Sequence, residues 1–305
     1  MRRTLRFALA LALAALPASA QQRDFSKVEM KVTPVSGNIY MLEGAGGNIG
    51  VSAGSDGILI VDDQYAPLAE KIRAALKSIN PGKLKYVLNT HYHGDHTGSN
   101  AAFGPESSII AHENVRKRLA QGTNVRGNAV PPSPPEALPV VTFANAVSVH
   151  FNGEEIKAIH YPRGHTDGDS IIFFTKANVV HMGDHFFVRR FPFVDLENGG
   201  TVQGLIDNVA KVIAEIPADA KVIPGHGPLS TVEDLKGYHR MLVETRDVVS
   251  QGMAAGKSLE DLQAAGLPEE WKEWGSGFID TKAWIATIHA SLESAKKNPG
   301  GSTHH

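Results

Sequence analysis

The sequence contains no cysteine among its 305 residues. Disulfides therefore cannot stabilise the chain, and no thiolate can serve as a nucleophile or as a metal ligand. Long apolar runs are also missing beyond residue 20, so no later segment is predicted to cross a membrane. There is no tandem repeat of about 20 to 50 residues, although a duplication between the two halves of the chain remains open.

Residues 1–20 carry the features of a secretory signal peptide. The stretch MRRTLRFALALALAALPASA has a basic start, an apolar run from Phe7 to Leu16 and a final ASA that suits a signal peptidase. The alternative is a membrane anchor, but the run is short for a bilayer and ends at Pro17. We therefore expect a periplasmic or secreted protein with no membrane segment in its mature form.

A large excess of positive charge is absent as well. The formal net charge is −2, and loss of the three arginines in the predicted signal peptide shifts it to −5. A mildly acidic chain is a poor candidate for binding the phosphate backbone of nucleic acids. We therefore expect a small-molecule partner and no nucleic acid, while the sequence leaves the oligomeric state open.

What the sequence does contain is the composition of a globular domain, with 42% hydrophobic and 20% charged residues. We predict one domain over residues 21–297 and a disordered tail over 298–305. The Pro-rich segment 128–139 is predicted to be a surface loop and not a linker, because strand patterns resume directly after it.

Short apolar runs bounded by glycine, proline or aspartate predict seven buried strands. They cover residues 57–63, 85–91, 107–113, 156–162, 170–175, 178–184 and 221–227. Apolar residues at helical spacing predict amphipathic helices within 68–79 and 205–216, and a closing helix within 284–292. Two strand-rich halves that are each followed by a helix indicate an α/β protein with sheets packed together and helices outside.

One stretch, NTHYHGDHTG at 89–98, holds His91, His93, Asp95 and His96. A string of this kind is expected on the order of once per thousand chains of such composition. Three further candidate ligands lie at or just beyond the ends of later predicted strands, namely His165, Asp184 and His226. Ligands on loops at one edge of a rigid sheet can converge on a single place.

Imidazole and carboxylate groups are the ligands that zinc prefers when thiolates are absent. Seven candidates are too many for one tetrahedral ion but suit two ions at about 3.5–4 Å, as in two-metal hydrolytic sites. A solvated polar turn would account for the string alone but not for the three later residues. The sequence therefore predicts a dinuclear metal centre.

These motifs, HxHxDH at 91–96 with GHTDGDS, MGDHFF and PGHG downstream, resemble the signature of the metallo-β-lactamase superfamily. The resemblance covers most of the chain and implies an αββα sandwich of two mixed β-sheets with helices on both outer faces. It implies two Zn²⁺ ions, one held by His91, His93 and His165, the other by Asp95, His96 and His226. Asp184 would bridge the two ions.

The resemblance also implies an exported dinuclear zinc hydrolase that opens a cyclic amide or ester by means of a zinc-bridging hydroxide, with Asp95 as the catalytic residue. β-Lactams are the first substrates to consider, because they act outside the cytoplasm. The missing cysteine and His96 resemble cysteine-free lactamases and the wider group of lactonases and glyoxalase-II-like thioesterases. Asp184 as a bridging carboxylate is more typical of that wider group than of dedicated lactamases. Fold and metal site are therefore better defined than substrate.

Two other classes of function are the alternatives. The same fold can carry iron in an oxidoreductase, although persulfide dioxygenases use a single iron and flavo-diiron proteins need an additional flavin domain. A metal- or nucleic-acid-binding module without catalysis is disfavoured by the bridging position implied for Asp184 and by the expected net charge of −5.

Polar residues near the predicted ligands have weaker assignments. Four polar residues flank the candidate ligands, namely Thr90, Thr97, Ser170 and His185. They could hydrogen-bond the ligand side chains, or they could cap local turns, and the sequence favours neither role. We expect turn roles for Asp62 and Asp63, with a hydrogen bond from one of them to the His91 loop as the alternative. Surface positions are expected for Arg189 and Arg190, with pairing to a substrate carboxylate as the alternative.

Two further groups complete the sequence-based assignments. The glycine-rich segment 43–50 is predicted to be a hairpin tip, and the family resemblance places it over the metal site with an open rim. Four histidines in or beside strand-like runs are expected to be ordinary core or surface residues, namely His112, His150, His160 and His181.

Overall fold

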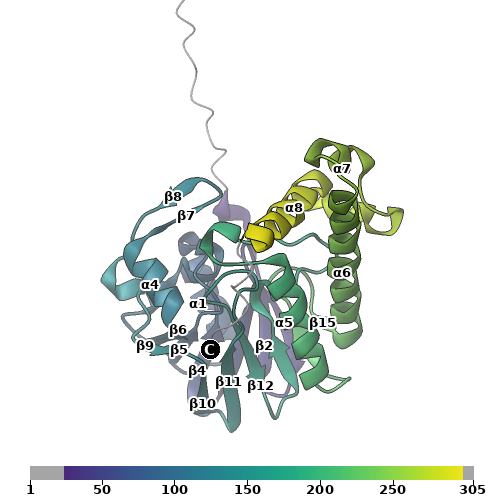
Figure 1. Ribbon diagram of the computed structural model, residues 1–305. Coiled ribbons are helices and arrows are strands. Elements are labelled where there is room, and N and C mark those ends of the chain that lie inside the picture. The colour runs from purple at the N-terminus through teal and green to yellow at the C-terminus, as the bar shows by residue number, and fades with distance from the viewer. Residues whose placement is uncertain (1–23, 298–305) are drawn as a thin grey trace, which may run out of the picture.

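The computed structural model describes residues 24–297 and shows two mixed β-sheets packed face to face (Figure 1). The predicted signal peptide at 1–20 and the predicted tail at 298–305 lie outside the described residues. None of the helices within 24–297 has the length and apolar character needed to span a bilayer.

The first sheet has seven strands, four from an antiparallel meander followed by three in parallel. In spatial order they are β1 (Lys31–Ser36), β2 (Ile39–Glu43), β3 (Ile49–Gly54), β4 (Gly57–Val61), β5 (Leu84–Leu88), β6 (Ser108–His112) and β9 (Val141–Phe143). Strand β4 is buried at every position, as its continuous apolar run predicts.

The second sheet has six strands, all antiparallel except for the parallel pair in which β13 meets β14. They are β10 (Ala146–Phe151), β11 (Glu154–His160), β12 (Ser170–Phe174), β13 (Val179–His181), β14 (Lys221–Ile223) and β15 (Ser230–Thr231). A separate two-stranded hairpin is formed by β7 (Thr123–Val125) and β8 (Asn128–Val130).

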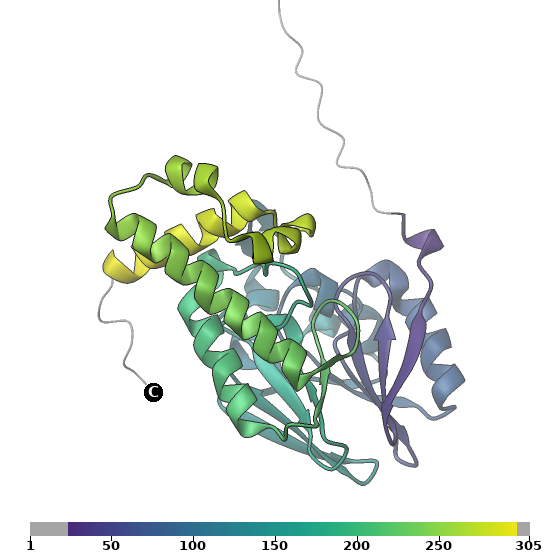
Figure 2. The same ribbon diagram turned by 90° about the vertical axis from the view of Figure 1, so that its right-hand side faces the viewer.

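Helices cover the outer face of each sheet, which gives four layers (Figure 2). On the outer face of the first sheet lie α1 (Ala69–Ile79), α3 (Asn100–Phe103) and α4 (Glu113–Gln121), while the short α2 (Gly94–Thr97) follows β5 at the edge of the sandwich. On the second sheet lie α5 (Val202–Glu215) and α6 (Val232–Ala254). Farther from this sheet, α8 (Thr281–Lys297) packs against α5 and α6, and α7 (Leu259–Ala265) packs against α8. Short 3-10 turns are η1 (Phe25–Lys27), η2 (Ala66–Leu68), η3 (Pro135–Ala137), η4 (Gly183–His185), η5 (Leu196–Asn198) and η6 (Glu269–Ser276).

Three apolar clusters hold these layers together. The cluster between the sheets joins residues such as Leu59 and Leu88 to Ile156 and Phe174. A second cluster seats α1 on the first sheet, and a third seats α5, α6 and α8 on the second. The αββα fold expected from the motifs is therefore confirmed.

The seven predicted strands and the three predicted helices are all present. Strands β5, β13 and β14 end three residues or more before the predicted boundary, at Leu88, His181 and Ile223. Their final residues leave the sheet to form loops that carry polar side chains. The Pro-rich segment 128–139 lies mostly on the surface as expected, but its first residues pair as β8.

Candidate metal centre

Seven polar side chains meet at one edge of the sandwich, where several strands of the two sheets end. They lie in the loop after β5 and on α2, in the loop between β11 and β12, in η4 after β13, and in the loop after β14. These are the seven residues singled out by sequence, His91, His93, Asp95, His96, His165, Asp184 and His226. The structure brings all of them together in groups that could hold metal ions.

The first group contains three buried histidines, His91, His93 and His165. His165 Nε2 lies 2.8 Å from His93 Nδ1. The imidazole of His91 stands edge-on to the other two rings, with centroids 4.8 Å and 4.6 Å away. Three imidazole nitrogens that face a common point form the ligand pattern of a zinc site with an open coordination position.

The second group combines Asp95, His96 and His226. His226 Nε2 lies 3.5 Å from Asp95 Oδ2 and 3.4 Å from His96 Nε2. His96 is fully buried, whereas Asp95 and His226 are partly exposed at the pocket side. This group therefore offers two imidazoles and one carboxylate beside solvent-accessible space.

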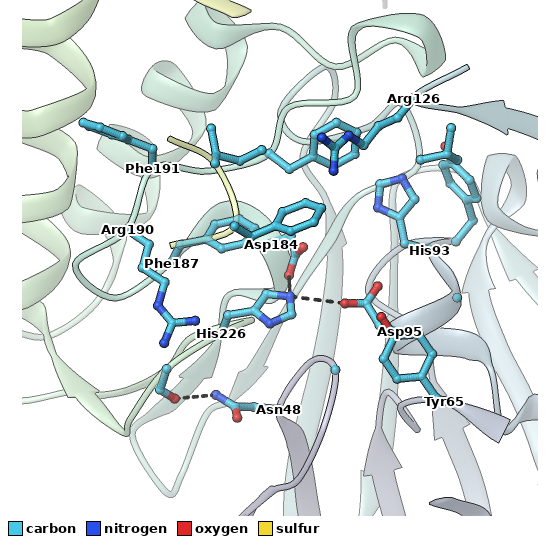
Figure 3. A pocket seen from close by; sticks show the side chains of 18 of the residues that line it. Asn48, Tyr65, His93, Asp95, Arg126, Asp184, Phe187, Arg190, Phe191 and His226 are labelled. Atoms are coloured by element: carbon cyan, nitrogen blue, oxygen red, sulfur yellow. Dashed lines mark hydrogen bonds and ion pairs between the residues drawn. The ribbon is translucent and has the colours of Figure 1, made fainter. Parts of the chain in front are cut away.

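Asp184 lies between the two groups, with one carboxylate oxygen directed at each. Figure 3 shows its contact with His226, which also faces Asp95. The Oδ2 of Asp184 is 3.9 Å from His91 Nε2 and 3.5 Å from His165 Nε2. Its Oδ1 is 3.1 Å from His96 Nε2 and 3.3 Å from His226 Nε2. A carboxylate in this position can bridge two ions, each of which would be completed by one group.

Unsatisfied buried atoms show that the cluster suits metal ions. His91 Nε2 and Asp184 Oδ1 are buried, and neither has a well-directed hydrogen-bond partner. Leaving such atoms without a partner costs about 1–3 kcal/mol each, so native proteins rarely do so without a functional reason. Divalent cations would satisfy these atoms, His91 Nε2 in the first group and Asp184 Oδ1 beside the second, and the nitrogen and oxygen donors suit borderline ions such as zinc.

The electrostatics of the cluster are dominated by burial and by close carboxylates. Burial lowers the pKa of His165 to about 4 and holds the pKa of His91 well below its usual value, so both imidazoles are neutral as metal ligands must be. Burial opposes charge on His96 too, but Asp184, Asp62 and Asp95 outweigh it and hold its pKa well above the usual value. The second group therefore attracts positive charge.

Asp62 at the end of β4 fixes the loop that carries the ligands. Its Oδ1 accepts the backbone N–H of Thr90 at 2.7 Å, and its Oδ2 accepts the Thr90 hydroxyl at 2.7 Å. The same Oδ2 lies 2.7 Å from His96 Nδ1, which leaves Nε2 of that ring free to face a metal. The expected turn role of Asp62 is wrong, and the alternative of a bond to the His91 loop is confirmed.

Asp195 performs the corresponding task for the first group and was not identified from the sequence. Its Oδ2 lies 2.9 Å from His93 Nε2 and also accepts the hydroxyl of Tyr92. The backbone oxygen of Phe193 lies 2.7 Å from His165 Nδ1, so this segment orients two of the three imidazoles. The motif VDLENG around Asp195 contains no ligand spacing that could have revealed it.

The hairpin tip predicted for residues 43–50 is confirmed, since it connects the antiparallel strands β2 and β3. It lies directly on the metal-binding segment, where the Gly47 N–H donates to the Asp95 carbonyl at 2.9 Å. A Cβ added at Gly47 would approach His96 Cε1 to 2.1 Å, so a larger residue cannot fit there. The glycines of this hairpin allow its close approach.

Among the remaining polar residues near the cluster, some contact a candidate ligand and others contact only neighbouring segments. Thr90 contacts His91 Nδ1 at 3.0 Å, whereas the Thr97 hydroxyl donates to backbone carbonyls of its own helical turn. His185 Nε2 is 3.1 Å from the amide of Asn208, and the Ser170 hydroxyl is buried without a partner. None of the histidines expected to be structural joins the ligand groups found within residues 24–297, in line with that expectation.

A pocket of about 630 Å³ opens directly over the cluster. Its floor includes His93, Asp95, Asp184 and His226, and its walls come from the β2–β3 hairpin, the β7–β8 hairpin and the segments 187–193 and 278–279. Arg190 lines this pocket, whereas its neighbour Arg189 lies on a different surface. The cluster is therefore accessible to a small molecule.

The αββα sandwich and this edge cluster define a class of proteins with a candidate two-metal centre. The family model of the metallo-beta-lactamase superfamily matches residues 32–238, which include all seven cluster residues. The chain belongs to the metallo-β-lactamase superfamily.

Curated relatives share part of the chain. A hydroxyacylglutathione hydrolase of Polaromonas is 30% identical over 163 residues, which cover 52% of this chain and 55% of that protein. The 2,4-dinitroanisole O-demethylase subunit alpha of Nocardioides is 27% identical over 164 residues, which cover 52% of this chain and 47% of that protein. The aligned region spans about half the length of either relative.

Solved structures show the same fold at low identity. A metallo-beta-lactamase from Pontibacter korlensis has a TM-score of 0.60 at 15% identity, and the alignment covers 70% of this chain and 99% of that one. A double mutant of the sec-alkyl sulfatase PisA1 has a TM-score of 0.67 at 13% identity, and the alignment covers 90% of this chain and 52% of that one. These neighbours support the fold alone.

Proposed function

We propose that the protein is an exported dinuclear zinc hydrolase that opens a cyclic amide or ester. The observation that carries the proposal is Asp184, whose two carboxylate oxygens face two separate ligand groups. His91, His93 and His165 would hold one ion, Asp95, His96 and His226 the other, and Asp184 would bridge them. Two bound divalent ions supply an activated water and polarise the carbonyl of the substrate.

The side chains of the chain itself have distinct tasks in this reaction. The Oδ2 of Asp95 faces His226 and His96, which leaves Oδ1 to accept the proton of the attacking water. Water adds to the carbonyl carbon, the bond to the ring nitrogen or oxygen breaks, and that proton passes to the leaving atom. Asp62 and Asp195 keep the imidazoles oriented during these steps.

A thioester hydrolase is the second candidate. The hydroxyacylglutathione hydrolase relative supports it, because that protein and this one share 30% identity over 163 residues. The predicted signal peptide favours the first candidate, since glutathione thioesters occur mainly inside cells. An iron-dependent oxidoreductase is a third candidate, which metal analysis of the purified protein would distinguish from a zinc enzyme.

A substrate panel on metal-quantified protein tests the proposal. Nitrocefin, an acyl lactone and a glutathione thioester are compared with two, one and no equivalents of zinc. We expect turnover of at least one substrate that rises with the second equivalent, and loss of turnover by about 10²–10⁴ in Asp95→Ala with the circular dichroism spectrum retained. Wild-type kcat in Asp95→Ala or in protein with sub-stoichiometric metal would refute the two-metal assignment.

A further inference from the structure

Four phenylalanines line the pocket. Phe187, Phe191 and Phe193 follow Asp184 in the chain, and Phe278 comes from the connection between η6 and α8. We call these four residues the phenylalanine wall. Phe187 and Phe191 are buried, whereas Phe278 is 70% exposed although it is a large apolar side chain. Aromatic rings in the lining of a pocket suit an apolar part of a ligand.

The pocket also contains two positive charges without counter-ions. Within residues 24–297, neither Arg126 nor Arg190 forms an ion pair, and both line the pocket. The carboxylate of Glu43 lines it too, but that group is already paired with Lys31 at 2.6 Å. Outside the metal cluster, the pocket therefore has an excess of positive charge that suits an anionic ligand.

The guanidinium of Arg126 lies over rings of the phenylalanine wall. Its carbon is 4.6 Å from the ring centroid of Phe278 and 5.9 Å from that of Phe193. Cation–π contacts of this kind do not use up the N–H donors of a guanidinium, which can pair with a planar anion. Figure 3 shows Arg126 and Arg190 on different sides of His226.

We propose that the substrate is an amphiphilic anion, with an apolar body packed against the phenylalanine wall and a carboxylate or similar planar group paired with Arg126. This inference rests on the hydrolase proposed above and specifies its substrate class. The family model ends at residue 238, so Phe278 belongs to a part of the chain that the model does not match. The C-terminal helical segment would thus determine substrate selection.

Binding of three simple probes to zinc-loaded protein tests the proposal by isothermal titration calorimetry. Octanoate and octanamide share the apolar chain and differ in charge, whereas acetate has the charge without the chain. In the wild type, we expect octanoate to bind about tenfold more tightly than either octanamide or acetate. The variants are Arg126→Gln and Phe278→Ala, with Arg189→Gln as the matched control because it removes the same charge outside this pocket.

We expect Arg126→Gln to weaken the binding of octanoate about fivefold to tenfold and to leave the affinity for octanamide unchanged. This result separates pairing of the carboxylate with Arg126 from its binding to the metals. Phe278→Ala should weaken both octyl probes about threefold to tenfold, and Arg189→Gln neither. Wild-type octanoate affinity in Arg126→Gln or in Phe278→Ala would overturn the proposal, as would equal affinity for all three probes. Because binding is measured without turnover, these failures are distinct from failure of the hydrolase assignment.

Discussion

At the scale of single residues, two aspartates fix the orientation of imidazoles that are candidate metal ligands. Asp62 lies 2.7 Å from His96 Nδ1, and Asp195 lies 2.9 Å from His93 Nε2. In each ring the other nitrogen faces the cluster, so the carboxylate fixes both the orientation and the tautomer. In each of the two ligand groups, therefore, a buried aspartate contacts the imidazole nitrogen that points away from the cluster.

Asp195→Asn tests this support without removing a ligand. The amide keeps the shape of the side chain but loses the charge that stabilises the bound imidazole, so we expect metal affinity to fall about 10- to 100-fold. The measurement is competition for zinc against a chromophoric chelator, with kcat and KM as a second readout. Asp247→Asn is the control, because Asp247 lies on α6 and its ion pair is with Arg246, remote in the chain from the ligand residues. Equal zinc affinity in wild type and Asp195→Asn would contradict the role.

At the scale of secondary-structure elements, the β2–β3 hairpin and the loop after β5 are fitted to one another. The Gly47 amide donates to the Asp95 carbonyl, and the amide of Gln64 donates to the Gly47 carbonyl at 2.8 Å. His96 fills the space where a side chain at position 47 would lie. The glycine at position 47 in the pattern GAGGN is thus required by packing against His96.

Gly47→Ala should therefore displace His96 and weaken the second metal position. We expect a destabilisation of about 1–3 kcal/mol, the range found for overpacking of a buried site, and loss of the second zinc equivalent. Equilibrium denaturation and metal content per chain are the two measurements. The matched control is Gly237→Ala in α6, where an added Cβ meets nothing within 4 Å and the free energy of unfolding should stay or rise. Two bound zinc ions in Gly47→Ala would disprove the close fit.

At the scale of the whole molecule, the two sheets are joined by a stacked pair of imidazoles away from the metal centre. His112 ends β6 and His160 ends β11, and their rings lie 3.7 Å apart at an interplanar angle of 12°. Burial, followed by the charge of His112, lowers the pKa of His160 to about 4, although Asp167 and Glu113 act in the opposite direction. Protonation of this pair is therefore unfavourable in the folded state.

The pair makes stability depend on pH in a definite direction. Above about pH 6.5 His160 is neutral in both states and has no effect, while below it the unfolded chain takes up the proton first. The free energy of unfolding should fall by up to about 2 kcal/mol between pH 6.5 and 4, allowing for the partial exposure of the ring. Urea denaturation at pH 7.5 and 5.0 measures the loss, which should be smaller in His160→Gln. An identical loss in this variant would exclude the pair as its source.

The sequence by itself predicted the main strands, sheets packed together with helices outside, and all seven residues of the edge cluster, and the resemblance of its motifs to the superfamily signature implied the αββα sandwich. Apolar periodicity indicates the elements, and dense histidine and aspartate spacing near strand ends is typical of metal sites. Their roles as ligands of two zinc ions stay predictions, as do export and hydrolysis. Only the tertiary structure showed the contacts of Asp195 with His93 and of Asp62 with His96, and the position of the Arg126 guanidinium over the ring of Phe278. Those contacts join residues between 34 and 152 positions apart, and no local pattern encodes which distant side chains packing will bring together.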